Sequence, residues 1–416
     1  MEDFAPNVKK HHIQEFSTKT DTRDYLAHAR KVAEKKGFLD WTIVDIDAHH
    51  VETVSWPEIT SYIDDPVVRH QAEMYHAERV GSPPYGLNGD LGLRYQDVGG
   101  RIPHQSSQRE VVKNKDLHRD VVLTRRAMHG LAVDYMVVFP TPMLFLGMHP
   151  QSDMEVFLTR AYNRWLTETI LPNDPGIVTL VVLPFNTPNE AVKMVEEFAN
   201  VPGVIGFCVT STRYKPVHAN EYMKLYQAIE ESGKPIAFHA GYHWQDPSLA
   251  TCNTFLGMHS LGFTWCNIVH MTNWILNGIP ERFPKLKSIW VESGLSWIPF
   301  LMQRLDDQYL MRQSEAPLLK RMPSEYMSEN CYYSCQPMEK SNIKALECTF
   351  DMIKAKTQLL YSSDWPHFDF DTPNVIYDLP FLNEQSKKNI LGLNALKLFN
   401  LDVKQKTNKQ KNNQVL

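Results

Sequence analysis

The side chains of greatest chemical interest begin in one short stretch, Ile43–Glu52, which reads Ile-Val-Asp-Ile-Asp-Ala-His-His-Val-Glu. It starts as an apolar strand and ends in charge. Side chains two residues apart share a face of a strand, so we expect Asp45, Asp47 and His49 to point the same way. Two carboxylates and an imidazole on a buried face are costly without a compensating partner, which a divalent cation would supply. A solvated strand end with a hydrogen-bonded histidine is the alternative.

Reactive side chains also follow later apolar stretches of the chain. They are Arg213 in Thr-Ser-Thr-Arg, His239 in Phe-His-Ala-Gly, Glu292 in Val-Glu-Ser-Gly, and Asp364 and His367 in Ser-Asp-Trp-Pro-His. Taken singly, His239 could be a hydrogen-bonded core histidine and Asp364 a turn residue. Two carboxylates and two imidazoles, however, suit Zn²⁺, Mn²⁺, Fe²⁺ or Co²⁺ and leave positions for water or substrate. The predicted ligands of one such ion, zinc before the others, are Asp47, His49, His239 and Asp364.

For these side chains to meet, their segments must be parallel strands whose carboxyl ends lie together. Eight short segments rich in Val, Ile and Leu alternate with helical segments along the chain. They lie near Ile43, Tyr135, Ile177, Val204, Ile236, Lys287, Cys331 and Leu359. Continuous apolar runs are typical of strands buried on both faces. The alternation predicts an α/β fold, a (β/α)₈ TIM barrel with its site at the carboxyl ends of the strands. A doubly wound open sheet is the alternative, but no G-x-G-x-x-G follows the first strand.

The barrel is expected to span residues 41–402, with additions on both sides. Residues 1–40 are polar and helical in pattern, which predicts a peripheral arm, and the polar residues 403–416 predict a disordered tail. Residues 53–118 form a long insertion after the first strand with little periodicity, which is typical of a functional lid. Within it, Trp56 could cover the substrate and exclude water, or simply pack locally.

Composition excludes several classes of function. The 416 residues carry a net charge of -5 and no dense basic stripe, so a nucleic-acid partner is not expected. No apolar segment is long enough to span a membrane, and no secretory signal follows Met1. The six cysteines form no CxxC pair and are expected to be reduced. We therefore predict a cytoplasmic protein that acts on a small molecule.

Several of these motifs together resemble a known family. The motifs are Asp45-Ile-Asp-Ala-His49, Phe238-His-Ala-Gly241, the run Gly278–Lys287 that leads into Glu292-Ser-Gly294, and Ser362-Ser-Asp-Trp-Pro-His367. From about Ile43 to Leu401 the chain is similar to the second amidohydrolase family, which contains aminocarboxymuconate-semialdehyde decarboxylase and the resorcylate-type decarboxylases. The resemblance implies a TIM barrel with one catalytic divalent metal, and relatives that are commonly dimers.

The chain departs from the pattern of the decarboxylase prototype at two positions. Asp47 stands where the prototype has the first histidine of His-x-His, although acidic residues occur there in many relatives. Glu292 stands where the prototype has a catalytic histidine, and His270 in the preceding helix cannot be assumed to replace it. These departures leave the acid–base assignment to be settled by structure.

The resemblance implies non-oxidative decarboxylation of a small aromatic or unsaturated carboxylic acid. Asp364 or Glu292 would deliver the proton, with its pKa raised by burial near another carboxylate. Arg213 would anchor an anionic group, and Trp56 and His367 would contact the substrate. A metal-dependent hydrolase, with Asp364 as the general base, is the alternative. A catalytically inactive barrel that serves as a binding protein is a third reading, which the intact ligand set disfavours.

Overall fold

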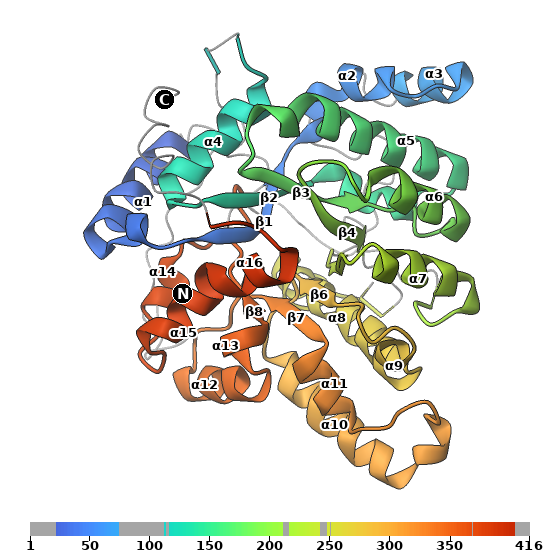
Figure 1. The fold of residues 1–416 in the computed structure, drawn as a ribbon, viewed down its shortest axis with the longest axis vertical. Helices are drawn as coiled ribbons and strands as arrows, with labels where there is room; N and C mark the ends of the chain where they lie inside the picture. The colour runs from blue at the N-terminus through green and yellow to red at the C-terminus, as the bar shows by residue number, and fades with distance from the viewer. Residues whose placement is uncertain are drawn as a thin grey trace.

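The computed structural model describes residues 22–74, 112–113, 116–210, 216–241, 248–249, 251–367 and 369–403. Eight parallel strands follow one another in chain order in a single sheet. They are β1 (Val44–His50), β2 (Tyr135–Pro140), β3 (Ile177–Val182), β4 (Val204–Thr210), β5 (Ile236–His239), β6 (Ser288–Val291), β7 (Cys331–Ser334) and β8 (Leu359–Leu360). Figure 1 shows the helices arranged around these strands. The (β/α)₈ barrel predicted from the sequence is confirmed, with all eight strands in the expected places.

The barrel closes between β1 and the segment that includes β8. The Ile46 amide donates to the Tyr361 carbonyl at 3.0 Å, and the Asp364 amide donates to the Asp47 carbonyl at 2.8 Å. The His49 amide donates to the Trp365 carbonyl at 2.6 Å. These bonds bring the beginning and the end of the barrel chain into one ladder.

The described helices that surround the barrel vary in length. They are α1 (Thr22–Lys36), α2 (Trp56–Ser61), α3 (Pro66–Met74), α4 (Arg119–Leu131), α5 (Ser152–Trp165), α6 (Pro188–Phe198), α7 (Met223–Glu231), α8 (Phe255–Leu276), α9 (Ile279–Arg282), α10 (Trp297–Met311), α11 (Pro323–Glu329), α12 (Ile343–Met352), α13 (Ala355–Gln358), α14 (Asn374–Tyr377), α15 (Glu384–Lys388) and α16 (Asn394–Phe399). Helix α6 shows why they form: its buried residues recur with helical spacing on one face, which packs on the sheet while the other face meets water. These residues are Ala191, Met194, Val195 and Phe198.

Two helices differ from the sequence expectation. Helix α8 begins at Phe255, where the pattern predicted a start at Phe263. The single final helix expected over Glu384–Phe399 is interrupted by a π-helix, η10 (Asn389–Leu393). A Cβ atom at Gly392 would lie 2.1 Å from the Thr42 carbonyl oxygen, so the backbone of η10 approaches the start of β1 more closely than any side chain would allow.

Two of the predicted additions are described in part. Within the predicted arm, helix α1 lies against α4, where a Cβ atom at Gly130 would meet Leu26 at 2.7 Å. The start of the predicted lid contains α2 and α3, but its residues 75–111 and 114–115 lie outside the described residues, as do residues 404–416 of the predicted tail. The lid and tail therefore stay predictions.

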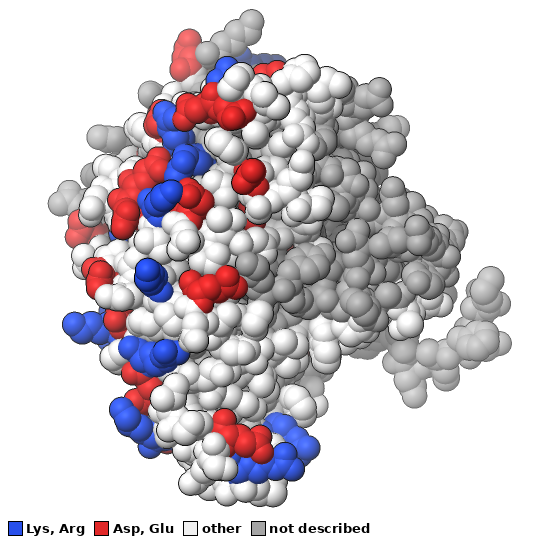
Figure 2. Space-filling view, turned by 90° about the vertical axis from the view of Figure 1, so that its right-hand side faces the viewer, with Lys and Arg blue, Asp and Glu red and all other residues white. Residues whose placement is uncertain are grey.

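Two further observations concern the charge of the described surface and the character of the described helices. On the face in Figure 2, acidic and basic side chains of the described residues are interspersed and form no continuous basic surface. Among the described helices, none combines the length and apolar character required to cross a bilayer.

We predict that Gly206→Ala destabilises the barrel. The added Cβ would lie 2.3 Å from Leu180 Cδ2 and 2.9 Å from the Pro235 carbonyl oxygen, so backbone as well as side chain must shift. We expect a loss of about 2–3 kcal/mol in unfolding free energy, measured by urea denaturation. Gly233→Ala is the control: its Cβ meets nothing within 4 Å, and only its left-handed φ of +71° is penalised, by about 1 kcal/mol. Equal losses in the two variants would contradict the packing argument.

Candidate metal centre

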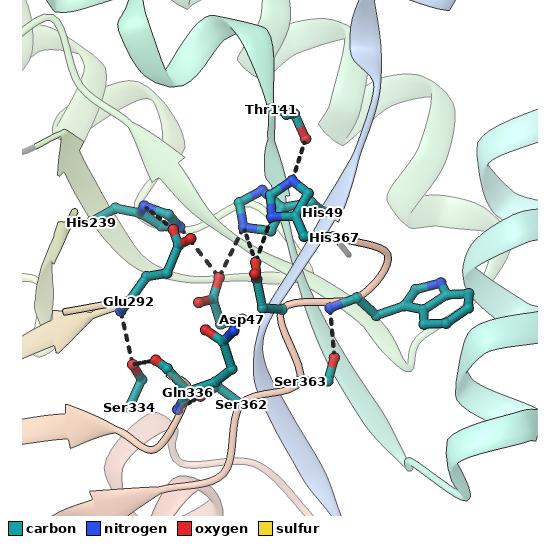
Figure 3. A network of polar contacts seen from close by, with 12 residues as sticks. Asp47, His49, Thr141, His239, Glu292, Ser334, Gln336, Ser362, Ser363 and His367 are labelled. Atoms are coloured by element: carbon teal, nitrogen blue, oxygen red, sulfur yellow. Dashed lines mark hydrogen bonds and ion pairs between the residues drawn. The ribbon is translucent and has the colours of Figure 1, made fainter. Parts of the chain in front are cut away.

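Acidic and imidazole side chains from several strands meet at the carboxyl end of the barrel. The ligand atoms of Asp47, His49, His239 and Glu292 all lie within 4.8 Å of one another, and so do those of His49, Asp364 and His367. Figure 3 shows His49 between His239 and His367. Three of the four ligands predicted from the sequence, Asp47, His49 and His239, therefore lie together with Glu292, and the fourth, Asp364, is joined to them through His49.

A bulge in β1 determines which side chains of the first stretch reach this centre. The register with β2 shifts between Asp45 and Ala48. Val44 and Ile46 both pack in the barrel interior, whereas Ala48 packs with the surrounding helices. The prediction that Asp45 shares a face with Asp47 and His49 is therefore wrong, because the extra residue reverses the alternation.

Asp45 instead holds the segment after β8 in place. Its carboxylate accepts the Ser363 amide at 2.8 Å and the Ser363 hydroxyl at 2.5 Å. Burial raises the Asp45 pKa to about 7, against the opposing effect of these hydrogen bonds. Asp45 thus positions Asp364, the residue that follows Ser363.

The two predicted histidine ligands are oriented by backbone carbonyls. His49 Nδ1 lies 3.0 Å from the Pro140 carbonyl oxygen, and His239 Nδ1 lies 2.8 Å from that of Ala240. A carbonyl only accepts, so Nδ1 is the protonated nitrogen in both rings and Nε2 carries the lone pair in the neutral form. Such a bond from the second ring nitrogen is usual for metal-bound histidines.

Both Nε2 atoms face the same carboxylate oxygen. Asp47 Oδ1 lies 3.3 Å from Nε2 of His49 and 3.3 Å from Nε2 of His239. Neutral imidazole lone pairs and a carboxylate would repel one another at this distance, so a proton or a metal ion must lie between them. In addition, Asp47 Oδ2 is buried with no hydrogen-bond partner among the described residues. The donor atoms therefore fit a divalent cation.

The pKa values of Asp47 and His49 reflect the attraction between the carboxylate and the imidazoles in the protein without a metal ion. Burial by itself would raise the Asp47 pKa and lower that of His49. The charges and hydrogen bonds of the histidines override burial and lower the Asp47 pKa, and hydrogen bonds with Asp364 and Asp47 raise the His49 pKa to about 10. A proton on His49 thus takes the place that a metal ion would occupy.

Asp364 completes the set from the segment after β8. It is fully buried, and its backbone has a left-handed φ of +58°. Its Oδ1 lies 3.2 Å from His49 Nε2 and accepts the Nδ1–H of His367 at 2.7 Å. His367 in turn stacks on His49, with ring centroids 4.3 Å apart. This position makes His367 an orienting partner of Asp364.

Glu292 enters the centre directly after β6. Its φ is +55°, also left-handed, and its amide donates to the Ser334 hydroxyl at 2.9 Å. Its Oε2 lies 3.6 Å from His239 Nδ1. Burial, and then the negative charges of Asp364 and Asp47, raise the Glu292 pKa well above its usual value. Burial beside these carboxylates therefore favours the protonated form of Glu292 in the protein without bound metal.

Trp56, another predicted site residue, lies outside this centre, and Arg213 cannot be compared with it. Arg213 lies outside the described residues. Trp56 is 1% exposed in α2, and its indole N–H donates to the Ala72 carbonyl at 3.0 Å. These contacts give Trp56 a packing role. His270 is buried in α8 and meets the Phe238 ring, on the side of β5 that faces the helices.

Other residues of the centre were not found from the sequence. Thr141 Oγ1 lies 3.4 Å from His367 Nε2, and Phe139 packs edge-on against His239 at 4.9 Å between ring centroids. Gln336 joins the hydrogen-bond network below the carboxylates (Figure 3). Thr141 and Gln336 follow the ends of β2 and β7, so position in the barrel was the available signal.

Comparisons with known proteins agree with this architecture. Residues 114–401 match the model of a family described as amidohydrolase; this range begins after β1. Gamma-resorcylate decarboxylase of Rhizobium sp. is 21% identical over 270 residues, covering 61% of this chain and 79% of the relative.

Solved structures of low identity share the fold. The structure of 5-carboxyvanillate decarboxylase from Sphingomonas paucimobilis aligns with a TM-score of 0.62 at 20% identity, over 87% of this chain and 100% of that one. A dihydroxybenzoic acid decarboxylase from Polaromonas sp., with bound manganese and the inhibitor 2-nitroresorcinol, aligns with a TM-score of 0.59 at 19% identity, over 77% and 95% of the two chains.

We predict that the purified protein binds about one divalent ion per chain, measured by elemental analysis. His239→Ala and Asp47→Asn should each lose the ion, because each removes a donor from the buried cluster. His129→Ala, on the outer helix α4, is the control and should retain it. Equal metal content in all four proteins would contradict the assignment.

Metal binding should also release about one proton per ion at pH 7.5, since His49 is protonated below pH 10 in the metal-free protein and a ligand needs its lone pair. Below that pKa the ion competes with the proton, so apparent affinity should increase as the pH rises. Calorimetric titrations in two buffers of different ionisation enthalpy measure the release. Binding with no proton release would exclude Nε2 of His49 as a ligand.

Proposed function

This chain belongs to the amidohydrolase family, and from that premise we propose that it is a metal-dependent, non-oxidative decarboxylase of aromatic carboxylic acids. One observation carries the proposal: Glu292, a buried acid whose pKa is raised, lies within the group of side chains that could hold a divalent ion. Decarboxylation of an aromatic ring needs a proton donor at carbon and a Lewis acid near the carboxylate. The decarboxylases among the relatives support the same reaction.

The proposed metal ligands are Asp47, His49, His239 and Asp364. A divalent ion held by them would supply Lewis acidity and orient the substrate carboxylate with a neighbouring hydroxyl group. Zinc and manganese both accept imidazole and carboxylate ligands, and manganese was bound in the Polaromonas structure. We propose one of these two as the resident ion, and elemental analysis will distinguish them.

The two carboxyl groups beside the histidines have different roles in this proposal. Asp364 accepts the N–H of His367 at 2.7 Å, which favours its ionised form and suits it to be a ligand. Glu292 is the protonated partner. Two acids whose environments separate their pKa values are typical of a division between an acid and an anion.

Glu292 is proposed as the general acid. Its proton moves to the ring carbon that carries the carboxylate, and the bond from this carbon to the carboxylate then breaks. The electron pair of that bond returns to the ring, carbon dioxide leaves, and solvent restores the proton on Glu292. Phe139 and the burial of the cluster exclude water from the carbon during the transfer. A homodimer, expected by analogy with relatives, stays a prediction.

We predict that Glu292→Gln lowers the rate of carbon dioxide release by at least about 100-fold, because the amide cannot donate a proton to carbon. The metal content should stay unchanged, which separates an acid from a ligand. Carbon dioxide release from a panel of hydroxybenzoates is the measurement. Glu281→Gln, near the amino-terminal end of β6, is the matched control and should leave the rate unchanged.

The pH profile has a defined direction. The raised pKa of Glu292 means that the proton is present below this pKa and is lost as the pH rises through it, so activity should fall on the alkaline side.

If the metal-loaded protein cleaves amides or lactones and releases no carbon dioxide from any acid, the hydrolase assignment replaces this one.

A further inference from the structure

Gln336 is held rigidly beside the metal centre, just after β7. Its amide donates to the Ser362 hydroxyl at 2.9 Å, and its carbonyl oxygen accepts the Ser334 hydroxyl at 3.2 Å. The same Ser334 hydroxyl accepts the amide of Glu292. The backbone of Gln336 is therefore tied both to the segment after β8 and to the residue that we propose as the general acid.

The side chain of Gln336 has one satisfied end and one unsatisfied end. Its Nε2 donates to the Asp369 carbonyl at 3.3 Å. Because that carbonyl only accepts, the nitrogen must be on this side and Oε1 on the other. Oε1 is buried, in a residue only 1% exposed, and has no hydrogen-bond partner among the described residues. Figure 3 shows the side-chain amide pointing toward the carboxylates of the centre.

A buried acceptor without a donor is unusual and requires an explanation. Leaving an amide oxygen unpaired in the interior costs about 1–3 kcal/mol. A ligand that brings a hydrogen-bond donor would recover this free energy. Gln336 makes hydrogen bonds with Ser334, Ser362 and Asp369, and none of these described residues donates to Oε1.

The surroundings also restrict the charge of the group that can bind. Asp369 is partly buried and lies close enough to Asp364 to be influenced by its charge, and it forms an ion pair with His259 at 3.9 Å. An additional anion here would meet the negative charges of Asp364 and Asp369. The group that fits is neutral and donates a hydrogen bond.

We propose that Gln336 is a specificity-determining residue, whose Oε1 accepts a hydrogen bond from a hydroxyl or amino group on the substrate ring. This inference rests on the proposed function and narrows its substrate class. The enzyme selects aromatic acids with a neutral donor in addition to the groups held by the metal. A site with a fixed acceptor discriminates strongly against an analogue that lacks the donor.

The test compares two probes that differ by one hydroxyl group. Metal-loaded wild type, Gln336→Met and Gln336→Asn are titrated calorimetrically with 2-nitroresorcinol and with 2-nitrophenol. Methionine removes the acceptor at nearly the same volume, and asparagine withdraws it by one methylene group. Gln358→Met is the matched control: Gln358 is also a buried glutamine, but its Nε2 donates to the Cys331 carbonyl at the start of β7.

We expect wild type and Gln358→Met to prefer 2-nitroresorcinol by about tenfold, and both Gln336 variants to show almost no preference. The different acidity of the two probes cancels when variants are compared. Unfolding midpoints and metal content are measured alongside, and Gln336→Asn carries the test if Gln336→Met does not fold.

Two results would overturn the inference: no preference in wild type, or an unchanged preference in the Gln336 variants. If the preference is unchanged in the Gln336 variants but their rate of carbon dioxide release falls at a different alkaline pH, Gln336 positions Glu292 instead of selecting the substrate. Failure of the proposed function gives a different result. Wild type would then release no carbon dioxide from any acid, even if its preference for 2-nitroresorcinol depends on Gln336.

Discussion

The ladder between β1 and the segment after β8 is the interaction on which the rest of the site depends. It joins the two ends of the barrel through backbone bonds of Asp47 with Asp364 and of His49 with Trp365. These bonds bring the carboxylate of Asp364 beside Asp47 and His49, although Asp364 is far from them in the chain. Asp45 strengthens the junction from the other face of β1 through the backbone and side chain of Ser363. The bulge that turns Asp45 away from the centre therefore also secures the position of Asp364.

Crowding of acidic groups at this junction determines the chemistry. Carboxylates so close together cannot all ionise in a buried site unless a cation compensates them. The structure resolves this in different ways: Asp47 is paired with two histidines, Asp364 with His367, and the pKa of Glu292 is raised, which favours its protonated form. A metal ion between Asp47 and the histidines would release the proton of His49 and leave Glu292 as the remaining acid. One crowded cluster can thus provide both a cation site and a proton donor.

Backbone conformation contributes to the same arrangement. Glu292 and Asp364 both have left-handed φ values, +55° and +58°, which cost about 1–2 kcal/mol for a residue with a Cβ. Strain of this kind persists where surrounding bonds over-determine it and is concentrated at functional sites. Here the Glu292 amide is held by Ser334 and the Asp364 amide by the Asp47 carbonyl. The strained turn after each strand directs its carboxyl group into the cluster.

The sequence by itself determined the fold and most of the candidate site. Apolar runs of strand length and helical periodicity are local properties, and a reactive residue at the end of a strand is placed by the barrel whatever its neighbours are. His239, Glu292 and Asp364 could be placed in this way. Tertiary structure alone decided the rest. The position of Asp45 depends on Ser363, 318 positions away. The direction of the buried amide oxygen of Gln336 depends on the backbone carbonyl of Asp369, in the segment after β8. Neither leaves a periodic pattern in the sequence, because each arises from a contact between segments that meet only when the barrel closes.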